Sequence, residues 1–126
     1  MVYADDGEFT SRITRSGGEI RLVTSAGITE LEDSWHMEKD FGTTFHAWIK
    51  GGSDVRVFYG ARNHTYLDSH CLVQNKLMYW VNRQTYCLIL WLFAVVYHRR
   101  ARYKVLQSAI RDGLEGRLGV CLEYPL

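Results

Sequence analysis

Two side chains of this sequence could together carry out nucleophilic chemistry, the thiol of Cys87 and the imidazole of His46. A cysteine attacks a carbonyl as the thiolate, and a histidine within hydrogen-bond reach can accept the thiol proton. Cys87 follows Thr85, a good helix N-cap residue, at the start of an apolar run. The positive end of a helix dipole lowers the pKa of a nearby thiol, so this placement favours a reactive cysteine. The alternative is that Cys87 is a small buried hydrophobic residue.

A second candidate site is a cluster of basic side chains downstream of the apolar run. It consists of Arg99, Arg100, Arg102 and Lys104, with His98 before them and Tyr97 and Tyr103 alongside. Such a cluster can bind RNA, because cations hold phosphates and aromatic rings stack on bases, or it can touch an anionic membrane surface. The alternative is a solvated helix end, where cations suit the negative pole of the helix dipole.

The sequence predicts neither a metal site nor a cofactor. Cys71, His64 and His70 lack the spacing of a zinc site. The glycine pairs Gly17-Gly18 and Gly51-Gly52 have the sequence context of turns rather than of a phosphate-binding loop.

The apolar run Thr85–Tyr97 is the element expected to position Cys87. It has no polar group between Cys87 and Val96. A helix that is apolar on every side has to be surrounded, and this one is shorter than the roughly 20 residues that cross a bilayer. We therefore expect a buried central helix, which continues as an amphipathic helix into the basic cluster and stops at Gly113.

Alternating apolar residues predict strands around this helix. The clearest signal is a hairpin of Thr43–Ile49 and Val55–Tyr59, turned at Gly51-Gly52, which would carry His46. Other expected elements are strands at Phe9–Thr14, Glu19–Thr24, Leu77–Val81 and Leu118–Tyr124, and helices within Ser25–Lys39 and Asp68–Lys76. The predicted fold class is therefore α+β, with an antiparallel sheet packed on a buried central helix.

Length and composition indicate one globular domain. The chain has 126 residues, of which 47% are hydrophobic, and its net charge is +1. We expect a flexible N-terminus over residues 1–7 and a single domain over residues 8–126. Three cysteines are an odd number without the spacing of a disulfide framework, and no signal peptide precedes them. This pattern favours a reducing, intracellular compartment.

Two segments resemble those of a known family. The segment Phe45–Gly60 (FHAWIKGGSDVRVFYG) resembles the H-box of the lecithin-retinol acyltransferase-like proteins, and Leu77–Phe93 (LMYWVNRQTYCLILWLF) resembles their NC box. A compact version of this papain-like fold occurs as the 2A protein of the H-box/NC type in some picornaviruses. The resemblance covers roughly residues 43–97.

The resemblance implies roles for particular residues. His46 takes the place of the general base and Cys87 that of the nucleophile. Phe58 stands where cellular members carry a second polar residue, usually histidine, and Tyr86 where an asparagine usually precedes the cysteine. Without the second histidine the base is poorly oriented, which predicts impaired catalysis.

The resemblance also implies a function. It predicts a non-proteolytic viral 2A protein of the host cell cytoplasm, acting in RNA replication or encapsidation. Such a protein would bind host or viral proteins, RNA through its basic cluster, or a membrane surface peripherally. The alternative is an active thiol acyltransferase or phospholipase, in which Cys87 attacks an ester carbonyl and His46 accepts the thiol proton.

Overall fold

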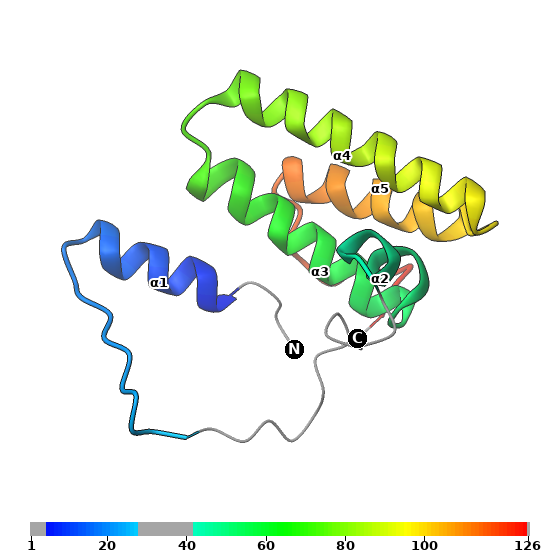
Figure 1. The fold of residues 1–126 in the computed structure, drawn as a ribbon. Coiled ribbons are helices and arrows are strands. Elements are labelled where there is room, and N and C mark those ends of the chain that lie inside the picture. The colour runs from blue at the N-terminus through cyan, green and yellow to red at the C-terminus, as the bar shows by residue number, and fades with distance from the viewer. Residues whose placement is uncertain (1–4, 28–41, 126) are drawn as a thin grey trace.

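The computed structural model describes residues 5–27 and 42–125, and the regular elements within them are helices (Figure 1). The helices are α1 (Asp5–Arg15), α2 (Thr44–Lys50), α3 (Asp54–Tyr66), the π-helical turn η1 (Leu67–Leu72), α4 (Lys76–Val96) and α5 (Arg100–Leu114). The described residues contain no strand. The prediction of an α+β fold with an antiparallel, papain-like sheet on a central helix is therefore wrong.

The segment predicted to form the clearest hairpin instead forms α2 and α3. The Thr43 side chain accepts a hydrogen bond from the His46 N–H, and the Ser53 side chain accepts one from the Arg56 N–H, so each begins a helix. Between the two helices Gly52 has a φ of 61°, which glycine adopts without strain. The glycine pair is thus a turn, as predicted, but it joins two helices.

Helix α4 begins well before the apolar run that predicted it. The Asn75 side chain accepts a hydrogen bond from the Met78 N–H and caps the helix, and the segment Leu77–Val81, predicted as a strand, lies in its first turns. Thr85 is not an N-cap, because its hydroxyl donates to the Val81 carbonyl one turn back. Cys87 consequently lies in the middle of a 21-residue helix rather than at its start.

The two strands predicted near the N-terminus are also absent from the described residues. Phe9–Thr14, predicted as a strand, lies in α1, which already begins at Asp5 within the segment expected to be flexible. Glu19–Thr24 is not a strand either. The helix predicted within Ser25–Lys39 falls largely outside the described residues.

The buried core is built from residues of α2, α3, α4 and α5. Helices α3 and α5 lie side by side, while α4 packs on α5 and on α2 (Figure 1). The largest fully buried side chains are Ile49, Val57, Phe58, Leu90 and Leu106. Helix α5 follows the prediction closely: it buries Val105, Leu106 and Ala109 and ends at Leu114. It is nevertheless separate from α4, because the chain turns at His98, whose φ is 54°.

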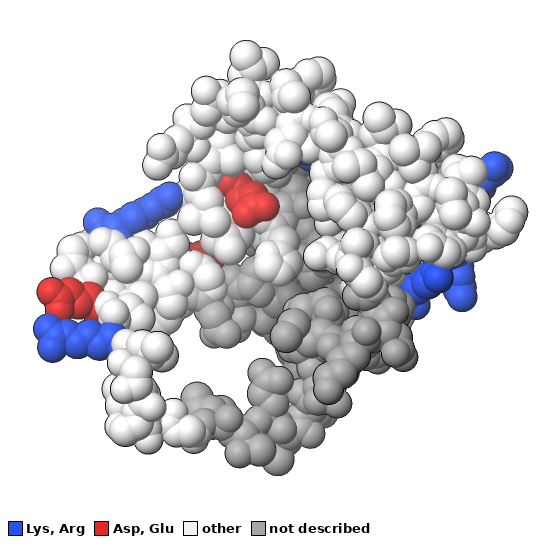
Figure 2. Space-filling view, viewed as in Figure 1, with Lys and Arg blue, Asp and Glu red and all other residues white. Residues whose placement is uncertain are grey.

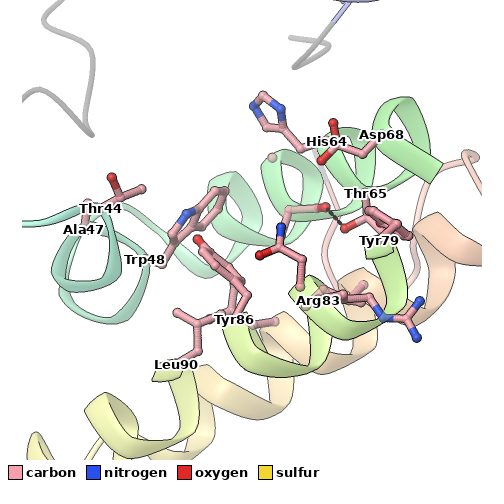
Figure 3. A pocket seen from close by; sticks show the side chains of 15 residues that line it. Thr44, Ala47, Trp48, His64, Thr65, Asp68, Tyr79, Arg83, Tyr86 and Leu90 are labelled. Carbon is pink, nitrogen blue, oxygen red and sulfur yellow. Dashed lines mark hydrogen bonds between the residues drawn. The ribbon is translucent and has the colours of Figure 1, made fainter. Parts of the chain in front are cut away.

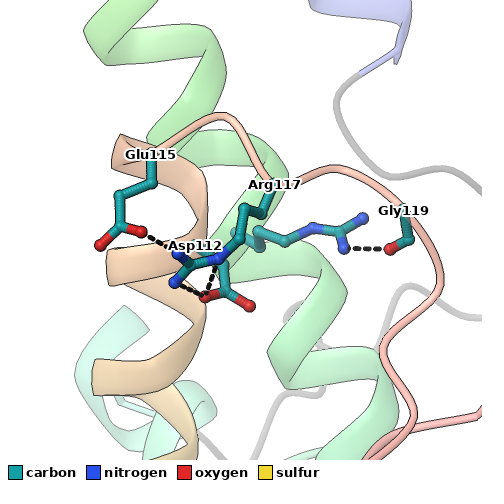
Figure 4. Close-up of polar contacts among 5 residues, drawn as sticks. Asp112, Glu115, Arg117 and Gly119 are labelled. Atoms are coloured by element: carbon teal, nitrogen blue, oxygen red, sulfur yellow. Dashed lines mark hydrogen bonds and ion pairs between the residues drawn. The ribbon is translucent and has the colours of Figure 1, made fainter.

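The C-terminal segment, predicted as a strand at Leu118–Tyr124, is held by side chains instead of a sheet. The buried Arg62 guanidinium donates to the Gly119 carbonyl at 2.6 Å (Figure 4) and also to the Leu118 carbonyl at 2.9 Å. Arg117 forms ion pairs with Asp112, at 2.6 Å, and with Glu115. The two Arg62 hydrogen bonds satisfy backbone carbonyls that a strand partner would otherwise satisfy.

Candidate functional site

His46 is a bridge between α2 and the end of α4. Its Nε2 lies 2.6 Å from the Tyr97 hydroxyl, and its Nδ1 lies 3.0 Å from the Thr43 hydroxyl. The imidazole also packs edge-on against Phe93, with ring centroids 4.8 Å apart. Because both ring nitrogens are engaged within the protein, this geometry suits a packed, half-buried histidine that holds two helices together.

Cys87 and His46 face different parts of α4. His46 contacts Phe93 and Tyr97, whereas Cys87 stands six residues before Phe93, about 9 Å further back along the helix axis. Burial raises the pKa of the Cys87 thiol, and the nearby charge of Arg83 lowers it only in part. The helix dipole acts on the terminal turns, so it does not lower the pKa of a mid-helix thiol.

The two positions that depart from the family pattern also have structural roles. Phe58 is completely buried and stacks on Tyr124, with ring centroids 4.6 Å apart. Tyr86 packs against Phe45 and accepts a hydrogen bond from the Trp48 side chain. Burial raises the pKa of Tyr86 to about 12. Neither side chain orients His46.

The basic cluster is divided between structure and solvent. Arg102 is nearly buried, pairs with Asp54 at 3.0 Å and donates to the Gly52 carbonyl at 2.9 Å, so it anchors α5 to the α2–α3 turn. Arg99, Arg100 and Lys104 are exposed. Figure 2 shows lysine and arginine side chains at the end of the molecule where α4 gives way to α5. Three of the four predicted binding residues therefore have side chains available to a partner.

The outward face of α4 is mostly apolar and is interrupted near its middle by the exposed side chains of Gln84 and Thr85. Its exposed large side chains are Leu77, Met78, Trp80, Val81, Leu88, Trp91, Leu92 and Val96. Leu77 is 70% exposed and Val96, near the other end of the helix, is 68% exposed. The surface over α4 in Figure 2 is accordingly free of charged side chains on the side shown. The central helix predicted to be buried is thus buried on one side only, mainly through Leu90 and Ala94.

A cavity of about 640 Å³ lies on the other side of α4, between α4 and α3. Its base includes Leu90 from α4 and Leu106 and Ile110 from α5. Figure 3 shows the aromatic side chains Trp48 and Tyr86 on one side of this space and a group of polar side chains on the other. The polar group comprises His64, Thr65, Asp68, Tyr79, Asn82 and Arg83.

The described residues form neither a metal site nor a membrane-spanning helix. Within residues 5–27 and 42–125, no three histidine, cysteine or acidic side chains are grouped so that they could hold a metal ion. In the same part of the chain, no helix combines the length and the apolar character needed to cross a bilayer.

Comparison with family models, curated proteins and solved structures finds no match for this chain.

Sequence reasoning missed both the outward face of α4 and the cavity. The first had a signal: Leu77, Val81, Leu88 and Leu92 recur at the helical period and follow the capping residue Asn75. The cavity had none, because its walls come from α2, α3, η1, α4 and α5, whose packing the local sequence does not encode.

Proposed function

We propose that this protein binds an anionic membrane surface through the outward face of α4. The apolar side chains of that face would enter the boundary between headgroups and acyl chains, while the cations near the two ends of the helix contact lipid phosphates. The observation that carries this proposal is a mostly apolar, exposed face on a 21-residue helix that has basic residues near both of its ends.

The size of the apolar face supports a docking role. If each of its side chains exposes roughly 100 Å², together they expose on the order of 800 Å², which is one partner's share of a standard interface. The largest apolar patch on a typical monomer is about 300–600 Å² and is itself often functional. A face of this area is costly to leave in water.

The charge of the chain around α4 selects an anionic partner. From Ser69 to Arg111 the sequence contains no aspartate or glutamate. The cations in this stretch are Lys76, Arg83, Arg99, Arg100, Arg102, Lys104 and Arg111. Each Lys or Arg near an anionic leaflet contributes about 1 kcal/mol of attraction, so the exposed members alone supply a useful share of the binding free energy.

The shape of α4 fits a helix that lies in the membrane plane. It is about 31 Å long, and Trp80 and Trp91 lie on the outward face, where indole rings favour the headgroup level. Amphipathic helices with aromatic and aliphatic residues on one side and cations nearby bind in this way without crossing the bilayer.

A second copy of the chain fits the same face less well. Lys76 stands at one end of α4 and Arg99 and Arg100 follow its other end. A parallel pair of α4 helices would place identical cations together, and an antiparallel pair would place Lys76 beside Arg99 and Arg100. Either arrangement brings like charges together, which disfavours the pairing.

The picornavirus 2A interpretation loses its structural basis, and only its expectation of action through binding agrees with the present proposal. The hairpin and the strand that carried the family resemblance are helices here, so an acyltransferase-like fold is no longer proposed. Action through binding rather than catalysis agrees with the proposal above. A role in RNA replication and a location in the host cytoplasm stay predictions from the family resemblance, and RNA binding by Arg99, Arg100, Arg102 and Lys104 stays a prediction from the sequence.

The proposal can be tested by co-sedimentation with phosphatidylcholine vesicles, with and without phosphatidylserine. Binding should require the anionic lipid, weaken with salt, and fall at least tenfold in Leu88→Glu. The matched control is Leu122→Glu, because Leu122 is 96% exposed in the C-terminal segment. Arg99→Gln with Arg100→Gln should reduce the preference for phosphatidylserine.

Two outcomes would overturn the proposal. One is equal binding of Leu88→Glu and Leu122→Glu to the vesicles. The other is a wild-type protein that is dimeric without lipid, does not sediment with vesicles and becomes monomeric in Leu88→Glu, which would make the face a protein interface.

A further inference from the structure

The cavity between α3 and α4 is the second feature without an assigned role, and it does not depend on membrane binding. Its volume of about 640 Å³ lies within the 300–1,000 Å³ that is usual for small-molecule sites. Gly60 and Ala61 on α3 leave room opposite α4, and the base is made of the apolar side chains Leu90, Leu106 and Ile110. This base suits the hydrocarbon part of a ligand.

The aromatic rings that line the cavity on its two sides suit a cation. Trp48, Tyr79 and Tyr86 line it from α2 and α4. The Trp48 side chain donates a hydrogen bond to the Tyr86 phenol, which fixes both rings relative to one another. The faces of aromatic rings attract organic cations, most strongly where the ligand is partly removed from water.

Asp68 is the carboxylate that lines this cavity, and Figure 3 shows its side chain on the same side as Thr65 and Tyr79. None of the ion pairs found among residues 5–27 and 42–125 includes Asp68. Burial raises the pKa of Asp68, and the neighbouring His64 lowers it in part. A cationic ligand could form with this carboxylate the close ion pair that none of the described side chains forms.

The cation of Arg83 does not fill that position. Its guanidinium lies against the Tyr79 ring, with the guanidinium carbon 5.8 Å from the ring centroid, and Figure 3 shows it directed away from His64 and Asp68. The polar mouth of the cavity therefore presents a carboxylate, and its walls present aromatic rings.

We propose that this cavity binds a small amphiphilic organic amine. The ammonium group lies between the Asp68 carboxylate and the ring of Tyr79, and the apolar body extends toward Leu90 and Leu106. Binding involves no covalent step. A fatty acid of the same length would bring its carboxylate close to Asp68 and is disfavoured by that repulsion.

The proposal is tested with three ligands of one chain length that differ in charge: octylamine, octanol and octanoate. Isothermal titration of the full chain at about pH 8, where a free imidazole is neutral, measures each affinity without vesicles. Octylamine should bind about tenfold more tightly than octanol, because one charge-assisted hydrogen bond is worth roughly that factor. Octanoate should bind most weakly.

Asp68→Asn should remove the tenfold preference for octylamine and leave octanol binding unchanged. Asp68 is exposed at the cavity mouth, so this variant should fold. Glu123→Gln, a carboxylate replacement in the C-terminal segment, is the matched control and should keep the preference. Leu88→Glu should also keep it, which separates the cavity from the outward face of α4.

Three results would overturn the proposal: no binding of any of the three ligands, octanoate binding at least as tightly as octylamine, or an octylamine preference that survives Asp68→Asn. A loss of octylamine binding in Leu88→Glu would also do so, because it would place the ligand on the outward face.

Discussion

Gly113 is the position where the packing of α5 on α3 leaves no room for a larger side chain. A Cβ added there would overlap the Arg62 carbonyl oxygen and would lie 2.8 Å from the Thr65 Cβ. Neither neighbour can move easily. The Arg62 side chain is hydrogen-bonded to the C-terminal segment, and the Thr65 hydroxyl donates to the Ala61 carbonyl at 2.7 Å. Gly113→Ala therefore has to separate the two helices or distort one of them.

The expected net effect is destabilising. Replacing glycine by alanine inside a helix gains up to about 1 kcal/mol, and less near a helix end such as this one. Forcing a methyl group into a closed contact costs about 1–3 kcal/mol or more, and here a backbone oxygen stands in the way. We expect the free energy of unfolding to fall by about 2 kcal/mol, which corresponds to roughly 5–10 °C in Tm for a chain of this length.

Gly60→Ala is the matched control, because it is the same substitution in the neighbouring helix. A Cβ at Gly60 would lie 3.4 Å from a Trp48 ring carbon, which is an ordinary van der Waals contact, so little has to move. This variant should be neutral or slightly stabilised. Urea unfolding followed by circular dichroism compares the two, and equal midpoints for Gly113→Ala and Gly60→Ala would refute the close packing of α5 on α3.

Two further predictions concern titrating groups. Burial raises the pKa of the Cys87 thiol, so its alkylation by iodoacetamide should reach half its maximal rate at a higher pH than the alkylation of a small free thiol. Peptide mass spectrometry measures this rate. Rapid labelling of Cys87 at neutral pH would instead support the thiol-enzyme alternative. The pKa of Tyr86 is about 12 in the folded protein and near 10 when unfolded, so the stability gained by keeping this phenol neutral is complete below about pH 10 and is lost as the pH rises toward 12. Tyr86→Phe should flatten that part of the stability–pH profile, and an unchanged profile would show that Tyr86 is not buried as described.

The sequence predicts some elements of this fold well. The buried side of α5, with Val105, Leu106 and Ala109, follows from their helical spacing, and Gly113 lies close to the observed end of the helix. The apolar run from Cys87 to Val96 is helical as predicted. Each of these segments is long enough for its pattern of apolar residues to fit a helix and not a strand.

The predicted strands failed where the period was ambiguous. Phe45, Ala47 and Ile49 alternate, but Phe45, Trp48 and Ile49 also have helical spacing, so a short run fits either structure. The capping side chains of Thr43 and Ser53 decide the matter. Their hydrogen bonds provide partners for the first free N–H groups of each helix, whereas a hairpin would have needed a further strand to cover its edges.

The candidate sites depended on long-range contacts that the sequence does not encode locally. Arg102 belongs to the basic cluster in the sequence, yet it is held by Asp54 and Gly52, about 50 residues away. Likewise, the distance between His46 and Cys87 follows from where α2 docks on α4, and that docking is set by Phe93 and Tyr97.

The most direct test of the central claim is the position of the outward face of α4 relative to a bilayer. Tryptophan fluorescence should be measured in phosphatidylserine-containing vesicles whose lipids carry bromine high on the acyl chains. Trp80 and Trp91 should be quenched by the brominated lipid, and quenching should be lost when both are changed to phenylalanine. Quenching that is absent, or that persists in Trp80→Phe with Trp91→Phe, would contradict the proposed contact between α4 and the membrane.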